Sequence, residues 1–232
     1  MSYRFEIIEK YPRITIIHQR CANGDLWATA KRTVLQRKAG AWQAAAEFPR
    51  CYPRDLFGFS RPTARAMRAD KCNLYANKNG KLLGIRGGWA YAIEGGAVTR
   101  LFEIQGDCVL HRAISEDGAG NIYFGEYFMN PERKPVCIWR VAPDLQSWEA
   151  AAELPGIRHV HGIYPDPFNP ATFWVTVGDF AGECYLLRTR DHFRTMERFG
   201  DGSQTWRAVN LFFTPDRDRK STRLNSSHDQ IS

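Results

Sequence analysis

Residues 112–124, Arg-Ala-Ile-Ser-Glu-Asp-Gly-Ala-Gly-Asn-Ile-Tyr-Phe, decide the fold, because their pattern recurs along the chain. Each copy opens with a basic, a small and an apolar residue, and the first three copies continue through an Asp and a turn into a strand with an aromatic. Successive copies begin 47, 49 and 46 residues apart (65 to 112, 112 to 161, 161 to 207). A repeat of this length with about four short strands is typical of a β-propeller blade. The copies start at Arg65, Arg112, His161 and Arg207.

The segments around these copies also have the pattern of strands. Short runs such as RITIIHQ (13–19), TFWVTVGD (172–179) and ECYLLRT (183–189) alternate or are apolar throughout, and Gly, Pro, Asn and Asp separate them. Only the Ala-rich pieces 42–48 and 148–154 look helical, and each is too short to form a helix alone. We therefore predict an all-β protein, with four to five blades of a β-propeller that has six or seven in its complete ring.

The end of the chain does not continue the repeat. Residues 218–232, DRKSTRLNSSHDQIS, contain no aromatic residue, and KSTRLNSSH (220–228) resembles translated sequencing-adapter sequence. We expect a partial propeller over residues 1–217 and a non-native or disordered tail over 218–232. The alternative is a genuine basic tail that binds an acidic partner.

Composition limits the function classes. The 232 residues are 44% hydrophobic and 25% charged, with 32 Lys and Arg against 25 Asp and Glu, which is typical of a folded protein. The two charge signs are interspersed, so we expect no nucleic-acid partner, and no apolar stretch predicts a membrane span. The first ten residues, MSYRFEIIEK, do not resemble a signal peptide, so the sequence predicts a cytoplasmic location. The oligomeric state is not predicted.

The repeat also places candidate functional residues. In a propeller the first strand of each blade lines the central channel, so the four residues that start the copies are expected to converge around one axis. Glu126 and Asp179 end second strands and are expected to reach the same face. Clustered guanidinium groups need carboxylate partners or an anionic ligand, and Arg binds a carboxylate through two parallel hydrogen bonds. We therefore expect an acidic sugar as ligand, or alternatively arginines that only tie blades together.

Residues 158–161, Arg-His-Val-His, carry the most chemistry. With strand periodicity His159 and His161 point to the same side, as an acid/base pair or a metal pair requires. Two histidines leave a metal site incomplete, and a third ligand would have to come from Gln204, Glu126 or His111. No metal and no cofactor are therefore predicted. The predicted catalytic residues are His159, His161, Glu126, Asp179 and Tyr127, and the predicted substrate-binding residues are Arg65, Arg112, Arg158, Gln204 and Arg207.

One motif resembles a known family. Residues 189–196, Thr-Arg-Asp-His-Phe-Arg-Thr-Met, are similar to the Asp-box, Ser/Thr-x-Asp-x-Gly-x-Thr-Trp, of sialidase-like (BNR-repeat) propellers, with Phe193 in place of Gly and Met196 in place of Trp. Residues 144–148 resemble a shortened second copy, and residues 39–42 a third that lacks the Asp. The resemblance implies that these residues are structural and lie away from the active site.

The same resemblance implies a function. Sialidases bind the sialate carboxylate through three arginines, for which Arg65, Arg112 and Arg207 are the candidates. The nucleophile pair would be Tyr127 with Glu126, and the acid Asp179. Propeller polysaccharide lyases, which use His and Tyr with an Arg, fit the segment 158–161 at least as well. We expect a carbohydrate-active enzyme, a glycoside hydrolase or a lyase for an acidic sugar, or alternatively a non-catalytic propeller that binds a protein or glycan on its basic face.

Overall fold

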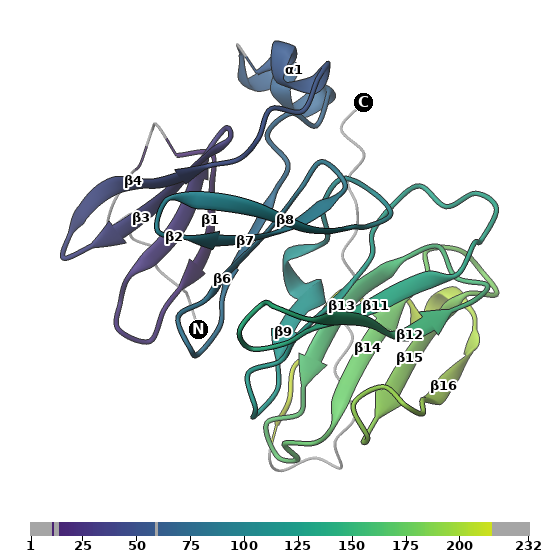
Figure 1. Ribbon diagram of the computed structural model, residues 1–232. Coiled ribbons are helices and arrows are strands. Elements are labelled where there is room, and N and C mark those ends of the chain that lie inside the picture. Colours follow the sequence, from purple (N-terminus) through teal and green to yellow (C-terminus); the bar gives the residue numbers. More distant parts are fainter. Residues whose placement is uncertain (1–10, 12–13, 59, 215–232) are drawn as a thin grey trace, which may run out of the picture.

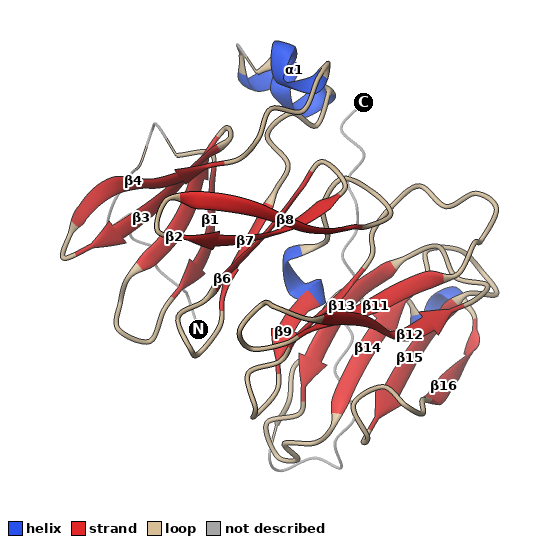
Figure 2. Cartoon of the chain, viewed as in Figure 1, coloured by secondary structure: helices blue, strands red, loops and turns tan. Residues whose placement is uncertain are grey.

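The computed structural model describes residues 11, 14–58 and 60–214. These residues form four four-stranded antiparallel sheets, and each sheet uses four strands that follow one another in the chain. Sheets built in this way are propeller blades, so the predicted all-β propeller is confirmed, with four blades described. The sheets follow one another from the N-terminal to the C-terminal end, and helical segments occur only in connections (Figures 1 and 2).

Each blade is a meander of four strands. Blade 1 contains β1 (Ile16–Arg20), β2 (Leu26–Ala30), β3 (Thr33–Lys38) and β4 (Ala41–Glu47). Blade 2 contains β5 (Asn73–Ala76), β6 (Leu82–Arg86), β7 (Trp89–Glu94) and β8 (Ala97–Glu103). Blade 3 contains β9 (Ile114–Glu116), β10 (Ile122–Gly125), β11 (Val136–Val141) and β12 (Trp148–Leu154). Blade 4 contains β13 (Val160–Pro165), β14 (Phe173–Val177), β15 (Cys184–Thr189) and β16 (Glu197–Gly202). The connections contain α1 (Arg61–Ala66) and the 3-10 turns η1 (Arg54–Phe57), η2 (His111–Ala113) and η3 (Gln204–Trp206).

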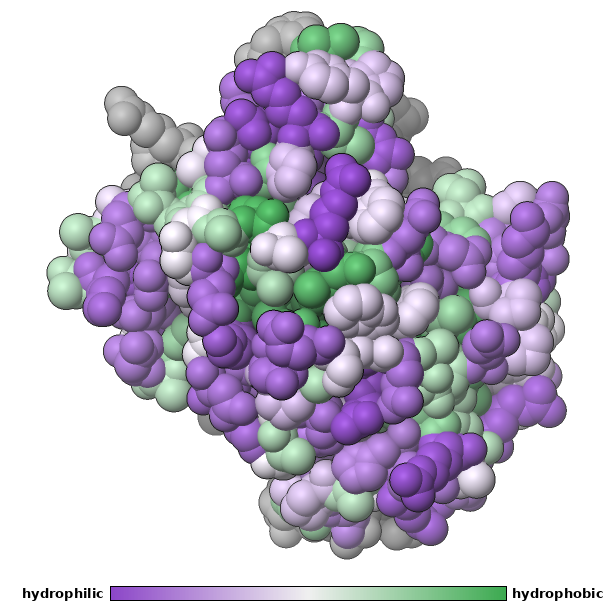
Figure 3. Space-filling view, in the orientation of Figure 1, coloured by the Kyte–Doolittle hydropathy of each residue, from purple (hydrophilic) through white to green (hydrophobic). Residues whose placement is uncertain are grey.

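The hydrophobic core lies between neighbouring blades. Phe102 of blade 2 stacks on Phe124 of blade 3, with ring centroids 6.1 Å apart. Tyr123 of blade 3 contacts Phe173 of blade 4 at 5.2 Å. The second strands of blades 2, 3 and 4 are buried along their whole length, and β14 accordingly reads as a nearly continuous apolar run. Hydrophilic side chains cover most of the face in Figure 3, and apolar ones gather in its middle.

The innermost strands end in equivalent turns, which fix the register of the repeat. In each turn one side-chain oxygen accepts hydrogen bonds from two backbone N–H groups of the turn, and the residues that do so are Asn77, Asp117 and Asp166. The residues five positions before them are Cys72, Arg112 and His161. Arg65 was expected at this position, and that expectation is wrong: Arg65 lies on α1, in the long connection between blades 1 and 2.

The Ala-rich segments are strands and not helices. Residues 42–48 lie mostly in β4 and residues 148–154 form β12, the outermost strands of blades 1 and 3. Each pairs along its length with the third strand of its blade. Backbone hydrogen bonds to that neighbour outweigh the helix propensity of a few alanines, because helix nucleation is unfavourable in a segment this short.

The turn between β15 and β16 has hydrogen bonds that suit the Asp-box pattern. Asp191 Oδ1 accepts hydrogen bonds from the Thr195 backbone N–H at 2.9 Å and from Thr189 Oγ1 at 2.9 Å. Phe193, at the position of the motif's Gly, has a φ of 72°, and its ring is 2% exposed in the core between blades 3 and 4. This turn joins the third and fourth strands of blade 4, so it lies at the end of the blade opposite the start of β13.

The first strand and the end of the second strand share one edge of each blade. In blade 4, Val160 at the start of β13 pairs with Val177 at the end of β14. We call this edge, with the loops after the second strands, the site face. Within the described residues no helix is long and apolar enough to cross a membrane. The tail predicted over 218–232 lies outside the described residues.

Candidate functional site

Two buried histidines lie where blade 4 begins. His159 immediately precedes β13 and is 2% exposed, and His161 within β13 is 4% exposed. Val160 pairs with Val177 and Gly162 pairs with Thr176, so His161 is the extra residue of a β-bulge. A Cβ at Gly162 would collide with the Tyr164 ring. The bulge and this glycine place both imidazoles on one side of the strand.

The two imidazole rings face each other through their Nε2 atoms. His159 Nε2 lies 3.1 Å from His161 Nε2. On the other side of each ring, His159 Nδ1 lies 3.2 Å from the carbonyl oxygen of Phe128, and His161 Nδ1 lies 3.3 Å from that of Ala208. Carbonyl groups from blade 3 and from the segment after blade 4 therefore set the orientation of both rings.

Asp179 joins the pair from the loop that follows β14. Its Oδ2 lies 3.2 Å from His159 Nε2, and its Oδ1 lies 3.1 Å from His161 Nε2. Arg158 donates to Oδ2 at 3.1 Å, and Arg207 donates to Oδ1 at 3.0 Å. The two imidazoles beside it hold the pKa of the Asp179 carboxyl well below its usual range, so the carboxylate is ionised. We call these five residues the His–Asp cluster.

The His–Asp cluster carries more positive than negative charge. Arg158 and Arg207 each bring one positive charge, and Asp179 alone brings a negative one. The side chains of Arg158 and Asp179 are only 16% and 14% exposed, so water screens them weakly. Among the described residues the buried Nε of Arg207 has no hydrogen-bond partner. Both observations favour an additional anionic group at this place.

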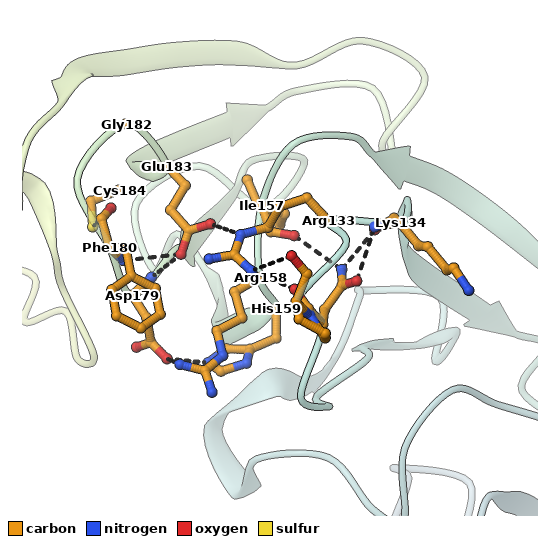
Figure 4. Close-up of polar contacts among 12 residues, drawn as sticks. Arg133, Lys134, Ile157, Arg158, His159, Asp179, Phe180, Gly182, Glu183 and Cys184 are labelled. Carbon is orange, nitrogen blue, oxygen red and sulfur yellow. Dashed lines mark hydrogen bonds and ion pairs between the residues drawn. The ribbon is translucent and has the colours of Figure 1, made fainter.

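The Asp179 loop is held by a second carboxylate (Figure 4). Glu183 Oε1 accepts hydrogen bonds from the backbone N–H groups of Asp179 and Phe180, both at 2.9 Å. Its Oε2 pairs with Arg133 from the loop of blade 3. Gly178 has a φ of 84°, and a Cβ there would overlap the Glu183 carbonyl. A glycine is therefore required where the loop leaves β14.

The chain after β16 closes the other side. Gln204 Nε2 donates to the backbone carbonyl of Asp179 at 2.7 Å. Arg207, three residues further on, reaches the carboxylate of the same residue. Of the residues predicted from the sequence, the structure therefore brings together Arg158, His159, His161, Asp179, Gln204 and Arg207.

Tyr127 and Glu126 lie nearby but differ in their surroundings. The Tyr127 ring packs on the His159 ring, with centroids 4.1 Å apart. Glu126 is 1% exposed. Its two oxygens accept hydrogen bonds from the Gln105 backbone and side chain, the Cys137 backbone and the Trp139 indole. These donors come from blade 3 and from the connection after blade 2, so the geometry of Glu126 is that of a group that holds two blades together.

Two predicted arginines lie elsewhere. Arg65 is exposed on α1. Arg112 is exposed on η2 and lines a different pocket, with Tyr164 and Asn210. Glu183 and Arg133 were not predicted from the sequence. The third partner of the histidines was predicted to be Gln204, Glu126 or His111, and in the structure it is Asp179. The two glycines that flank the loop, Gly178 and Gly182, were the available signal for a tight carboxylate-presenting turn.

No protein-family model matches the chain, and no curated protein matches it. Among solved structures, two of the extracellular domain of BT4673, a two-component or one-component system of B. thetaiotaomicron, have TM-scores of 0.55 and 0.56 at 9% and 8% identity. They cover 90% and 91% of this chain, which spans 26% of each of them. YCF48 bound to D1 peptide has a TM-score of 0.48 at 16% identity, over 83% of this chain and 55% of its own.

These comparisons contradict the predicted location and support the predicted fold. The predicted cytoplasmic location is contradicted, because the two BT4673 structures are extracellular domains. At this identity the likeness concerns the fold alone. Together with the four meander sheets, it supports the propeller fold. The chain spans about a quarter of the length of the two BT4673 structures.

Proposed function

We propose that the chain is part of a carbohydrate-active, sialidase-like β-propeller that binds an acidic sugar at the His–Asp cluster. The excess of positive charge in the His–Asp cluster is the observation that carries the proposal. Two guanidinium groups share a single carboxylate, Asp179, so a second carboxylate would complete their partners. Sugar carboxylates, as in uronic acids and sialic acids, have the size and charge for this role.

The contacts favour elimination over hydrolysis. Glycoside hydrolysis uses a pair of carboxyl groups, one of them free to donate or accept a proton. Here the oxygens of Glu126 accept four hydrogen bonds and those of Asp179 face four nitrogen atoms. Elimination from a uronic acid instead requires neutralisation of the sugar carboxylate, so that a base removes the adjacent proton and the glycosidic oxygen leaves. Arg158 and Arg207 suit that neutralising role.

A second candidate is a non-catalytic propeller that binds an acidic glycan or a protein on this face. The oxygens of Glu126 and Asp179 are already occupied by hydrogen bonds and ion pairs, and no other carboxylate was predicted for acid/base chemistry. This also favours the non-catalytic candidate. Both candidates bind an anionic group of their ligand at the His–Asp cluster, and they differ in turnover.

The experiment compares acidic and neutral ligands. Sialosides and uronic-acid oligosaccharides are titrated against the 232-residue chain, beside the same sugars with the carboxylate reduced to an alcohol. The acidic sugars are expected to bind, and Arg158→Gln and Arg207→Gln are expected to weaken binding about tenfold or more, since each removes a charge-assisted hydrogen bond. Arg190→Gln, at an exposed arginine of the β15–β16 turn, is the matched control.

Three outcomes are informative. Equal binding of acidic and reduced sugars, or none, contradicts the proposal. Growth of the ultraviolet absorbance of an unsaturated uronate supports elimination, and new reducing ends without that absorbance support hydrolysis. Binding without any product supports the non-catalytic candidate.

A further inference from the structure

Three potential metal ligands converge in the His–Asp cluster. His159 Nε2, His161 Nε2 and a carboxylate oxygen of Asp179 lie within 4.8 Å of one another. The closest pairs are 3.1 Å for the two nitrogens, and 3.2 Å and 3.1 Å for each nitrogen with its nearer carboxylate oxygen. All three side chains are at least 85% buried, since the carboxylate is 14% exposed and both imidazoles are 3% exposed.

The partners on the far side of each ring assign the hydrogens. A carbonyl oxygen only accepts, so His159 Nδ1 beside Phe128 O and His161 Nδ1 beside Ala208 O each carry a hydrogen. The remaining nitrogen of each neutral ring, Nε2, then presents a lone pair. Two lone pairs and a carboxylate therefore face one another at contact distance.

Buried lone pairs that face one another in this way need an electron-pair acceptor between them. A metal ion satisfies both nitrogens and the carboxylate at the same time.

The spacing fits a first-row metal ion. Zinc binds His nitrogen and carboxylate oxygen at about 2.0–2.2 Å, so ligand atoms around it lie about 2.9 Å apart at 90° and about 3.4 Å apart at the tetrahedral angle. The observed 3.1 Å and 3.2 Å lie between these limits, and Asp179 turns a different oxygen to each histidine, as a carboxylate that binds an ion through both oxygens does. Each histidine gives its Nδ1–H to a backbone carbonyl, and Arg158 and Arg207 hold the carboxylate, as is common around metal ligands.

We infer that His159, His161 and Asp179 bind one divalent transition-metal ion. The two imidazole nitrogens favour Zn²⁺, Co²⁺ or Fe²⁺ over Mg²⁺ and Ca²⁺, which prefer oxygen ligands. Three protein ligands leave coordination positions open. The ion adds positive charge beside two arginines, so an anionic ligand completes its coordination. That last step rests on the proposed function, whereas the metal site itself does not require a sugar.

The test uses the full chain without a polyhistidine tag, stripped with a chelator and titrated with Co²⁺ and Zn²⁺ in the absence of sugar. One equivalent of Co²⁺ is expected to give visible d–d absorption. Zn²⁺ is expected to displace the Co²⁺ and remove this absorption, and Mg²⁺ is expected to have no effect. His161→Gln and Asp179→Asn should each lower the affinity about tenfold or more. His192→Gln is the control, because that side chain is 49% exposed and belongs to the β15–β16 turn.

A readout on the wild type avoids dependence on how the variants fold. In long-range ¹H–¹⁵N NMR spectra, Zn²⁺ should shift the Nε2 resonances of His159 and His161 and leave those of His192 unchanged. Absence of stoichiometric binding, unchanged Nε2 resonances, or equal loss in the His192→Gln control overturns the inference. Sugar binding is measured separately with chelator present. Loss of metal binding with retained sugar binding then leaves the proposed function standing, and the reverse result leaves the metal site standing.

Discussion

Glu183 accepts a hydrogen bond from the backbone N–H of Asp179 at 2.9 Å, and through it one buried carboxylate positions another. The side chain of Glu183 is 4% exposed, and its second oxygen pairs with Arg133. Blade 3 therefore anchors the loop of blade 4 that presents Asp179 to the two histidines. The geometry of the His–Asp cluster depends on this contact between blades.

The first prediction concerns this anchor. Glu183→Gln removes the charge that pairs with Arg133, and loss of one partner of a buried pair costs about 3–5 kcal/mol. Because Arg133 is 30% exposed, water compensates part of that cost, and we expect a loss of about 2 kcal/mol in the free energy of unfolding in urea. Glu94→Gln, in the exposed pair with Lys81, should cost less than about 1 kcal/mol. Equal losses in the two variants would contradict the anchoring role.

The second prediction compares two glycines of the same loop. Gly178 and Gly182 both have positive φ, at 84° and 93°, but only at Gly178 would a Cβ overlap the Glu183 carbonyl; at Gly182 nothing lies within 4 Å. Gly182→Ala should lower the free energy of unfolding by about 1–2 kcal/mol, because an alanine is strained in the left-handed backbone conformation. Gly178→Ala should cost clearly more in urea denaturation and should also weaken ligand binding at the His–Asp cluster. Similar values for the two variants would show that the close approach does not matter.

Much of this fold was predictable because blades repeat. The spacing of the copies is imposed by four short strands and their turns, and it placed Arg112 and His161 at the starts of the innermost strands of blades 3 and 4. Strand alternation predicted His159 and His161 on one side, and the structure brings the two rings together there, although a β-bulge at His161 interrupts the regular alternation. Arg65 was misplaced because Arg-Ala-Met, which begins on α1, resembles the start of the repeat by chance. The equivalent position of blade 2 is Cys72, and the residues there, Cys-Asn-Leu, differ from Arg-Ala-Met at every position.

The partners of each carboxylate were not predictable. Glu126 and Asp179 occupy equivalent places after second strands, yet the donors around Glu126 include Gln105 and Trp139, distant in sequence. Asp179 instead meets histidines because its neighbour strand carries them. Which carboxylate is engaged in packing and which belongs to a cluster depends on contacts between blades, and a single sequence does not encode those contacts in any local pattern.

The third prediction concerns Phe193 in the Asp-box-like turn. Its φ of 72° is strained for a residue with a Cβ, but its ring is 2% exposed and contacts Tyr123 and Phe173. Phe193→Gly relieves about 1–2 kcal/mol of strain and loses about 3–5 kcal/mol of packing. We expect a net loss of about 2 kcal/mol or more in urea denaturation. Ala39→Gly, at an exposed residue with a φ of 49°, should be neutral or slightly stabilising. A stabilising Phe193→Gly would contradict this balance.

The fourth prediction is a pH dependence of stability that His18 causes. Burial, with a smaller contribution from nearby His111, lowers the pKa of His18 to about 3. His18 Nε2 contacts Thr29 Oγ1 at 3.0 Å and lies 3.8 Å from the Cys72 thiol, so no carboxylate among these partners stabilises its charged form. In the unfolded chain an ordinary histidine binds a proton below about pH 6.5. The unfolded state therefore binds the extra proton, and stability is complete above pH 6.5 and falls as the pH decreases toward 3.

The measurement is the free energy of unfolding in urea between pH 7.5 and about pH 4.5. Relative to His18→Gln, which keeps an amide near Thr29 but does not titrate, the wild type should lose about 1.4 kcal/mol more per pH unit below 6.5. The same slope in wild type and His18→Gln would mean that His18 is protonated in the folded protein. The buried contact with Thr29 argues against that, since a charged imidazole there would lose hydration without gaining an anionic partner.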